Sequence, residues 1–359
     1  MERVTPVRGR AHRAMSRRRA ASALALILAI RAGAALPQSP IPKPQSPPPA
    51  WLPLIGEYGA GADRLLVRED EGRLEILIGR RPYTLTSAPD GFTVDSGPYR
   101  GGAARFERSP GGLVARLVLG GTLLPRRAVG TEEGVTFRIT PLHPVDSLRE
   151  AALAMRPPPQ PAGLRRPDLV DLTTLDRRIK LDIRYATTND FLGSAMYTSA
   201  RAFLQRPAAE ALRRALLWLV PQGYGLLIHD AYRPWYVTRM FWDATPDSLH
   251  MFVANPDSGS KHNRGCAVDL SLYDLRTGAP IRMVGGYDEF SPRSYADYPG
   301  GTSLQRWYRA LLRTAMEREG FKVIPEEWWH FDYKDWQRYP VLDLSFEALA
   351  ARRTPGSPD

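Results

Sequence analysis

The sequence predicts two folded domains: a small all-β domain, either a barrel or a sandwich, followed by an α+β domain in which helices pack on a mixed or antiparallel sheet. The chain has 359 residues, which is enough for about two domains. Short apolar runs between turn residues come first, and longer helical periods alternating with single strands come later. Proline clusters at residues 37–49 and 157–161 separate these patterns. The expected parts are a leader over 1–35, linkers over 36–50 and 146–167, the all-β domain over 51–145, the α+β domain over 168–345 and a tail over 346–359.

The leader has the pattern of a secretory signal peptide. It combines eight arginines with an apolar run over residues 20–30 and small residues over 32–35. The run is shorter than the roughly 20 apolar residues of a membrane-spanning helix, so we expect a cleaved signal and no stable membrane span afterwards. An uncleaved anchor and a translation start at Met15 are the alternatives, and the export route stays open. We expect an exported protein, located in the periplasm.

The charge and the cysteine count argue against two kinds of site. The formal net charge is +11, of which the leader carries +7 and the rest of the chain only +4. A basic leader accounts for this excess, so we expect no nucleic-acid partner. The single cysteine, Cys266, cannot form an intrachain disulfide or a cysteine-rich zinc site. Any metal ion must therefore be bound by carboxylates and by some of the six histidines.

The all-β domain is predicted from five short apolar runs. Breaks such as Glu71-Gly72 separate them, as between antiparallel strands joined by hairpins. The runs are residues 74–78, 83–85, 92–94, 113–119 and 135–139. The sequence of the all-β domain contains no group of residues typical of a catalytic site. His143 has no second possible metal ligand at a suitable spacing. We expect His143 to be structural.

Two helices, each followed by a strand, are predicted in the α+β domain. The helices are expected at residues 208–220 and 303–319, and the strands at 224–229 and 321–324. The helical period of the first places four residues on one face: Leu212, Leu216, Leu217 and Val220. The second ends at Gly320, where a left-handed residue closes a helix without a Cβ clash. This mixture predicts helices packed against one sheet.

Two distant stretches of the α+β domain carry side chains that can bind a metal ion. Residues 260–269 form a loop that continues into an apolar strand, and within it His262 and Asp269 offer an imidazole and a carboxylate. His330, in an aromatic strand, can supply a third ligand. Zinc with three protein ligands keeps an open fourth position for water and lowers the pKa of that water to about 7.

Glu327 has a natural role beside such a site. It precedes His330 by three residues and can accept a proton from the water without being a ligand. Positions three apart in a flat strand point to opposite faces, so we infer a bend near Trp328. The alternative is a buried aromatic cluster with a structural histidine and a surface glutamate. The presence of both stretches in one domain favours the catalytic interpretation.

The motifs Ser-x-His-x-x-Gly-x-Ala-x-Asp at 260–269 and Glu-x-Trp-His at 327–330 resemble those of the zinc D-alanyl-D-alanine dipeptidases, the family known from vancomycin resistance. The similarity spans about residues 168–345 and includes further motifs. These are residues 184–187, 224–227, 230–234 and 327–331. The resemblance implies one zinc ion per chain, bound by His262, Asp269 and His330, with Glu327 as the catalytic base.

The resemblance also implies a substrate pocket. Arg233 would approach the scissile carbonyl and stabilise the oxyanion. Asp288 matches the carboxylate that holds the substrate's ammonium group, and Ser260 and Tyr185 match residues that line the dipeptide pocket. The alternatives are a structural salt bridge for Arg233 and a solvated loop carboxylate for Asp288. The family's more usual motif is Met-Gly-Thr/Ser-x-Phe-Asp, and this sequence has Val-Gly-Gly-Tyr at residues 284–287. We therefore expect the pocket wall to differ.

We expect an exported enzyme whose substrate is the free dipeptide D-Ala-D-Ala. A dipeptide-specific enzyme needs a carboxylate for the ammonium group at one end and donors for the carboxylate at the other. The alternatives are a zinc D,D-carboxypeptidase that acts on longer cell-wall peptides and a non-catalytic cell-wall-binding protein. The partner of the β-domain stays open. We expect Cys266 to be a core residue and His229 and His250 to be structural.

Overall fold

The computed structural model describes residues 42–130 and 137–351. The expected leader, residues 36–41 of the first expected linker and residues 352–359 of the expected tail lie outside the described residues. None of the helices within the two described ranges combines the length and the apolar character that crossing a membrane requires.

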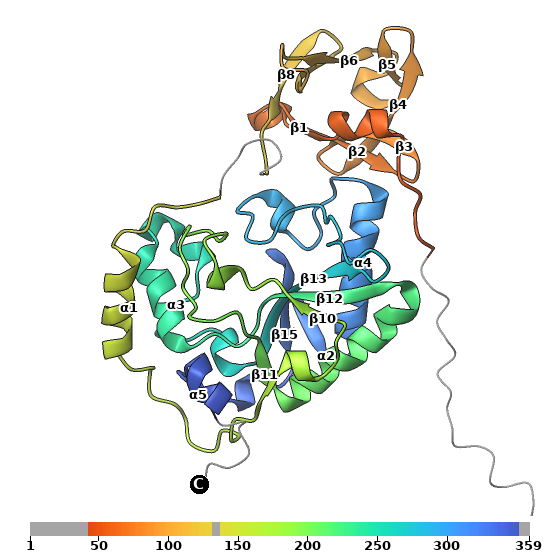
Figure 1. The fold of residues 1–359 in the computed structure, drawn as a ribbon. Helices are drawn as coiled ribbons and strands as arrows, with labels where there is room; N and C mark the ends of the chain where they lie inside the picture. Colours follow the sequence, from red (N-terminus) through yellow and green to blue (C-terminus); the bar gives the residue numbers. More distant parts are fainter. Residues whose placement is uncertain (1–41, 131–136, 352–359) are drawn as a thin grey trace, which may run out of the picture. The chain divides into compact units, whose positions relative to one another are not determined.

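Eight antiparallel strands close into a barrel near the start of the described chain (Figure 1). They are β1 Gly56–Tyr58, β2 Leu65–Asp70, β3 Arg73–Ile78, β4 Arg81–Ala88, β5 Gly91–Val94, β6 Ala103–Arg108, β7 Val114–Leu119 and β8 Thr122–Arg127. The barrel closes where β1 pairs with β8 and Glu57 lies opposite Arg127. Of the two all-β architectures that the sequence allowed, the barrel is the one that forms.

Alternating side chains fill the barrel interior. Leu74 and Ile76 of β3 are buried in the same core as Leu117 of β7, because residues two apart in a strand share a face. The turn between β2 and β3 consists of Glu71 and Gly72, both with positive φ (47° and 79°). Two-residue turns of this handedness match the twist of the flanking strands. The turn therefore fixes the register that directs the apolar residues inward.

One predicted strand, residues 135–139, is wrong. Its beginning lies outside the described residues, and its described part, 137–139, is not in a strand. Ile139 instead packs on the core of the second domain, and its backbone N–H donates to the carbonyl of Phe191 (2.8 Å). The barrel is already closed by β8, so it has no free edge to which another strand could add.

A five-stranded mixed sheet forms the centre of the second domain. Its order is β10-β12-β13-β15-β14, with β10 parallel to β12 and the other pairs antiparallel. The strands are β10 Ile179–Leu181, β12 Tyr224–Asp230, β13 Ala267–Asp274, β14 Phe321–Ile324 and β15 Glu327–Tyr333. A separate two-stranded sheet pairs β9 Leu169–Asp171 with β11 Phe203–Gln205. The domain is α+β, as the sequence predicts.

Helices α2 Arg206–Leu219 and α4 Ser303–Arg318 contribute apolar faces to the core of this domain, as does α3 Trp235–Ala244. In α2, Leu212 and Leu216 are fully buried, but Leu217 is 41% exposed. The expectation for Leu217 is wrong because it lies about 100° around the helix axis from Leu216, beyond the buried face. Helix α4 begins with a capping box between Thr302 and Gln305.

Two further helices lie in segments for which the sequence predicted a linker and a tail. Helix α1, Val145–Ala154, buries Leu148 and Ala152 and packs against α3 (Figure 1). Helix α5, Phe346–Ala351, buries Phe346 and Leu349. The prolines of residues 157–161 begin only after α1 ends, so the proline-rich composition describes only part of the predicted linker.

Candidate metal centre

The centre of the mixed sheet positions the candidate metal ligands. Asp269 on β13 and His330 on β15 are direct cross-strand partners, so their side chains share one face of the sheet. His262 lies in a 3-10 turn that leads into β13, and Gly265 ends this turn with a φ of 65°. This left-handed backbone conformation favours glycine, and a Cβ at Gly265 would also meet Leu169 Cδ2 at 2.5 Å. The loop and the two strands together bring the three expected ligands to one point.

Three ligand atoms face one another there. Asp269 Oδ1 lies 3.0 Å from His330 Nδ1 and 3.4 Å from His262 Nε2, and the two imidazole nitrogens are 3.1 Å apart. Ligand atoms bound tetrahedrally to zinc lie about 3.3 Å from one another, given metal–ligand distances of about 2.0–2.1 Å. The spacing therefore fits one small divalent cation with three protein ligands.

The outer nitrogens of the two imidazoles have partners of their own. His262 Nδ1 lies 2.7 Å from the carbonyl oxygen of Ala231, and His330 Nε2 lies 2.9 Å from Asp332 Oδ1. A neutral imidazole donates its proton to such an acceptor, and its other nitrogen then carries a lone pair. Both lone pairs point to the same place as the carboxylate of Asp269. Three lone-pair atoms at this spacing repel one another unless a proton or a metal ion lies between them.

The charge of the cluster also favours a cation. Burial lowers the pKa of His330, but the carboxylates of Asp269 and Asp332 outweigh it and raise the pKa to about 10. Burial tends to raise the pKa of Asp269, but the two imidazoles hold it well below its ordinary value. Asp269 Oδ1 is buried and has no hydrogen-bond partner among the described residues. The residues present therefore fit a metal ion.

Two residues that support the ligands were not identified from the sequence. Asp332 bonds to His330 and forms an ion pair with Lys261 (2.5 Å). The Tyr287 hydroxyl donates to Asp269 Oδ2 at 3.2 Å. The signal for Asp332 was its position two residues after His330, because such residues share a face of a strand. Tyr287 gave no such signal, since it reaches the cluster from a loop.

Glu327 lies at the start of β15, beside the cluster. Its Oε2 is 3.7 Å from His330 Nδ1. The pairing of β14 with β15 is irregular here, because Val323 lies opposite Phe331 whereas the next residue, Ile324, lies opposite Glu327. The irregularity allows two side chains three positions apart to reach one point. The strand thus departs from regular pairing between Glu327 and Phe331, the region in which we expected a bend.

The surroundings of Glu327 suit a group that carries protons. Burial raises the pKa of its carboxyl group, the charge of His330 lowers it, and the charge of Asp269 raises it again, with a net rise. A raised pKa makes a carboxylate a stronger base, which suits a group that accepts a proton.

Arg233 is held in place by a buried carboxylate. Its Nε and Nη2 donate to Asp230 Oδ2 at 3.0 and 2.7 Å, and its guanidinium lies 4.8 Å from the ring centroid of Phe241. Asp230 Oδ1 accepts a hydrogen bond from the Tyr197 hydroxyl (2.6 Å). The sequence interpretation gave Asp230 no role, although it stands three residues before Arg233 in the motif at 230–234. Asp230 fixes the direction in which the guanidinium points.

A cavity of about 320 Å³ lies over the cluster, a volume within the range of small-molecule sites. All eight side chains predicted for the site line this cavity: Tyr185, Arg233, Ser260, His262, Asp269, Asp288, Glu327 and His330. The remaining lining residues are largely apolar and include Phe191, Phe241, Phe252 and Phe290. Residues far apart in the sequence thus converge on one cavity.

Asp288 brings a carboxylate with one unpartnered oxygen to this cavity. Its backbone is left-handed (φ 54°), and no group in the described part of the chain donates a hydrogen bond to its buried Oδ2. Burial raises the pKa of Asp288 well above its ordinary value, and the charges of Asp269 and Glu327 raise it further. A cationic group in the cavity would counteract these effects.

Ser260 and Tyr185 also serve the local structure. Ser260 Oγ accepts a hydrogen bond from the backbone N–H of His262 at 3.2 Å, which supports the turn that carries this ligand. The Tyr185 ring packs edge-on against Phe241, with centroids 4.8 Å apart. Both side chains therefore contribute to the shape of the cavity wall.

Three other candidates lie outside the metal cluster found within the described ranges. Cys266 is buried, and burial raises the pKa of its thiol to about 12. The His229 ring stacks on Tyr287 with centroids 4.7 Å apart, and the His250 ring stacks on Trp242 with centroids 3.8 Å apart.

The fold is an α+β domain, and its central sheet brings two histidines and an aspartate together beside a glutamate. This combination is that of a metal-dependent peptidase. The family model described as D-ala-D-ala dipeptidase matches residues 165–347, and the chain belongs to this family of metallopeptidases. The matched residues include β9 to β15 and therefore the whole candidate metal centre, but they do not include the barrel.

Curated relatives of this chain are named D-alanyl-D-alanine dipeptidase. The protein from Escherichia coli (strain K12) is 35% identical over 187 residues, which cover 52% of this chain and 95% of that protein. The protein from Enterococcus faecium is 33% identical over 186 residues, covering 47% of this chain and 92% of that protein. The protein from Streptomyces coelicolor (strain ATCC BAA-471 / A3(2) / M145) is 32% identical over 175 residues, covering 44% of this chain and 87% of that protein.

Proposed function

We propose that this protein is an exported zinc dipeptidase that hydrolyses D-Ala-D-Ala. The observation that carries the proposal is the convergence of three mutually facing ligand atoms, Glu327, Arg233 and Asp288 on one cavity of about 320 Å³. Membership of the dipeptidase family supports dipeptide hydrolysis. The identity of the metal, the roles of the residues and the export of the protein are parts of the proposal.

His262 Nε2, Asp269 Oδ1 and His330 Nδ1 would hold one zinc ion per chain, because imidazole and carboxylate donors suit zinc. When bound, zinc would supply Lewis acidity that polarises the scissile carbonyl and makes water more acidic. The hydrogen bonds to Asp332 and to the Ala231 carbonyl hold both imidazoles in a ligating orientation before any ion binds.

Glu327 would carry the proton. It would accept a proton from the attacking water as the new C–O bond forms, and it would deliver that proton to the amide nitrogen as the C–N bond breaks. Its position 3.7 Å from His330 Nδ1 and its raised pKa support this role.

Arg233 and Asp288 would orient the substrate. The guanidinium of Arg233, held by Asp230, would stabilise the negative charge that develops on the carbonyl oxygen. Asp288 would accept hydrogen bonds from the free ammonium group, which would compensate its buried Oδ2. An N-acylated peptide has no such ammonium, so the pocket favours a dipeptide.

A panel of substrates tests this function. Zinc-loaded protein is incubated with D-Ala-D-Ala, L-Ala-L-Ala or N-acetyl-D-Ala-D-Ala, and the release of alanine is measured. We expect kcat/KM for D-Ala-D-Ala to exceed the other two values by about 100-fold or more, because each rejected analogue leaves a buried polar group unpaired or misplaced. Chelation should abolish the activity and zinc should restore it. Preference for the acetylated peptide would indicate a D,D-carboxypeptidase, and zinc binding without hydrolysis would indicate a non-catalytic binding protein.

Export is proposed from the leader sequence alone. The arginines and the apolar run of residues 1–35 support a cleaved signal. Mass analysis of the mature protein from cell fractions tests this, with a new N-terminus expected just after the small residues at 32–35. An intact N-terminus in the cytoplasmic fraction would contradict export.

A further inference from the structure

One loop contacts both the candidate active site and the barrel. We call residues 283–302 the substrate loop, because Tyr287 and Asp288 lie in it. The loop follows β13 in the chain, contacts the metal cluster through Tyr287 and ends at the N-terminus of α4. Between these points it contacts the barrel at several places, and these contacts bear on the position of Asp288.

A buried carboxylate holds the active-site part of the substrate loop. Glu289 Oε2 accepts hydrogen bonds from the backbone N–H of Gly286 (2.7 Å) and from Arg293 Nη2 (2.9 Å). Asp288 lies inside this turn with its left-handed backbone. A non-glycine residue keeps such a conformation only where the surrounding structure enforces it. The same Arg293 donates from Nη1 to the carbonyl oxygen of Val129, just after the last barrel strand (2.9 Å).

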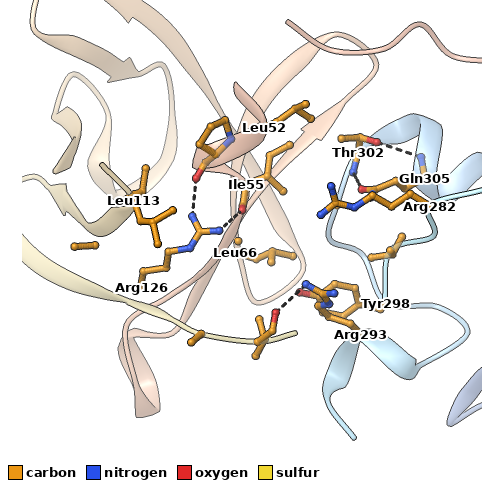
Figure 2. Close-up of a pocket in the computed structure, with 18 of the residues that line it drawn as sticks. Leu52, Ile55, Leu66, Leu113, Arg126, Arg282, Arg293, Tyr298, Thr302 and Gln305 are labelled. Atoms are coloured by element: carbon orange, nitrogen blue, oxygen red, sulfur yellow. Dashed lines mark hydrogen bonds between the residues drawn. The ribbon is translucent and has the colours of Figure 1, made fainter. Parts of the chain in front are cut away.

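The middle of the loop is anchored directly to the barrel wall. The Tyr298 hydroxyl donates to Glu57 Oε1 at 3.0 Å, and both side chains are buried. The rings and methyl groups of Tyr298 and Val284 pack with Leu66 and Leu77 of the barrel in one apolar cluster. Figure 2 shows Tyr298 and Arg293 on one side of a pocket and Leu66 on the other. A charged acceptor for a buried hydroxyl makes this a strong and specific contact.

The end of the loop is anchored by a second barrel carboxylate. Glu69 is 1% exposed. It accepts hydrogen bonds from the backbone N–H of Ser303 (2.7 Å) and from the Ser303 hydroxyl (3.1 Å). Its own backbone N–H donates to the carbonyl oxygen of Gly301. A carboxylate at the first residue of α4 also interacts favourably with the helix dipole.

Such an anchor is an addition to the catalytic domain. The match to the Escherichia coli relative places 95% of that protein within 187 aligned residues, which leaves it no room for a counterpart of the barrel. The barrel itself contains no metal-binding cluster in its described residues. Of the three buried glutamates in its described residues, Glu57 and Glu69 contact the substrate loop or the helix that follows it, whereas Glu75 pairs with Arg68 inside the barrel. These observations indicate that the barrel acts on the substrate loop and not through a metal site of its own.

We infer that the barrel positions the substrate loop so that Asp288 stays directed into the cavity, with Tyr298–Glu57 and Ser303–Glu69 as two of its anchors. The inference rests on the proposed dipeptidase function. Glu57, Glu69 and Tyr298 are positioning residues in this scheme, because they act through the loop and do not touch the substrate. Weakening the anchors should therefore weaken the recognition of the substrate's ammonium group and leave the metal centre intact.

Two variants and two matched controls test the inference. Tyr298→Phe and Glu69→Gln each weaken one anchor while keeping the shape of the side chain. Tyr295→Phe changes an exposed tyrosine in the same loop, and Glu107→Gln changes a carboxylate whose ion pair with Arg116 lies within the barrel. KM and kcat are measured with D-Ala-D-Ala. The inhibition constant of N-propionyl-D-alanine, which lacks the ammonium group, is measured in parallel.

We expect each anchor variant to raise KM by about three- to tenfold, the effect of one lost hydrogen bond, and to change kcat by less than about twofold. The inhibition constant of N-propionyl-D-alanine should change by less than about twofold, because Asp288 does not contact that inhibitor. Zinc content should stay at one ion per chain. Both controls should match the wild type in all three quantities.

Two results would overturn the inference. One is an unchanged KM in both anchor variants, and the other is an equal rise of KM and of the inhibition constant, which would mean general loosening of the site. If Glu69→Gln folds poorly, Ser303→Ala keeps Glu69 charged and removes only one of its donors, and a smaller rise in KM is expected. A wild-type protein that hydrolyses no D,D-dipeptide would instead reject the proposed function, so the two failures are distinguishable.

Discussion

The barrel and the metal centre both bury carboxylates, but the carboxylates differ in their hydrogen-bond and ion-pair partners. In the barrel, Glu57 pairs with Arg64 (2.6 Å) and Arg127 (2.9 Å), and Glu75 pairs with Arg68 (3.0 Å). In the metal centre, Asp269 Oδ1 and Asp288 Oδ2 have no hydrogen-bond donor in the part of the chain that the structure describes. Burial of a charge is therefore not in itself a functional signal. The signal is a buried oxygen whose partner is missing from the chain, because a ligand can supply that partner.

The largest effect is expected from removal of a metal ligand. His330→Ala should lose the zinc ion, and kcat/KM for D-Ala-D-Ala should fall below about one thousandth of the wild-type value. Metal content by elemental analysis and steady-state kinetics check this. The control is His250→Ala, which removes a ring that stacks on Trp242 away from the cluster. Normal zinc content in His330→Ala would contradict the ligand assignment.

The next largest effect separates the proton carrier from the ligands. Glu327→Gln should reduce kcat by about 10²- to 10⁴-fold, the usual contribution of a general base, and it should retain stoichiometric zinc. Glu326→Gln is the matched control, since it changes the neighbouring exposed glutamate. A normal kcat for Glu327→Gln would mean that another group carries the proton.

The metal centre could be predicted from the sequence because its ligands lie in compact local motifs. Residues 260–269 and 327–331 each combine a ligand with the turn or strand that positions it. The structure brings the two motifs together as adjacent strands, with Asp269 opposite His330. The roles of Asp230 and Tyr287 were missed because each acts through a neighbour in space, on Arg233 and Asp269.

The long-range pairings of the fold could not be predicted in the same way. The choice of a barrel over a sandwich depends on the pairing of β1 with β8, and strand alternation is the same in both architectures. The anchor between Glu57 and Tyr298 joins residues 241 positions apart. Helix α1 was missed because the prolines that follow it dominated the composition of the predicted linker.

Neutralising one carboxylate in each region should affect stability in opposite directions. Asp288→Asn removes a poorly compensated charge and keeps a residue that tolerates left-handed backbone, so the free energy of unfolding should rise while KM rises by about tenfold or more. Glu75→Gln removes a buried ion pair, so the free energy of unfolding should fall by about 1–3 kcal/mol, with kcat/KM unchanged. Denaturant unfolding and steady-state kinetics measure both. A loss of stability in Asp288→Asn would show that its charge is compensated after all.

The smallest effect is expected at Asp190, a buried carboxylate outside the metal cluster. It tests whether an unpartnered buried oxygen lowers stability there as well. Asp190 Oδ1 accepts a hydrogen bond from the backbone N–H of Leu192 (2.9 Å). Its Oδ2 is buried and has no hydrogen-bond partner within the described ranges. Burial raises the pKa of Asp190 to about 6. It therefore resembles Asp288 in its unpartnered oxygen, but it is not among the residues that line the cavity over the metal cluster.

Because the pKa of Asp190 is higher in the folded than in the unfolded chain, where it is about 3.9, the folded protein binds more protons between these two values. Its contribution to stability is therefore present below about pH 4 and is lost as the pH rises through about 6. Asp190→Asn keeps the acceptor for Leu192 and cannot ionise. It should match the wild type at pH 4 and exceed it in the free energy of unfolding by about 1–2 kcal/mol at pH 8, whereas the exposed control Asp247→Asn should show no such difference. An equal stability of Asp190→Asn and wild type at pH 8 would mean that an unpartnered oxygen signals a cost only where other carboxylates lie close by, as they do around Asp288.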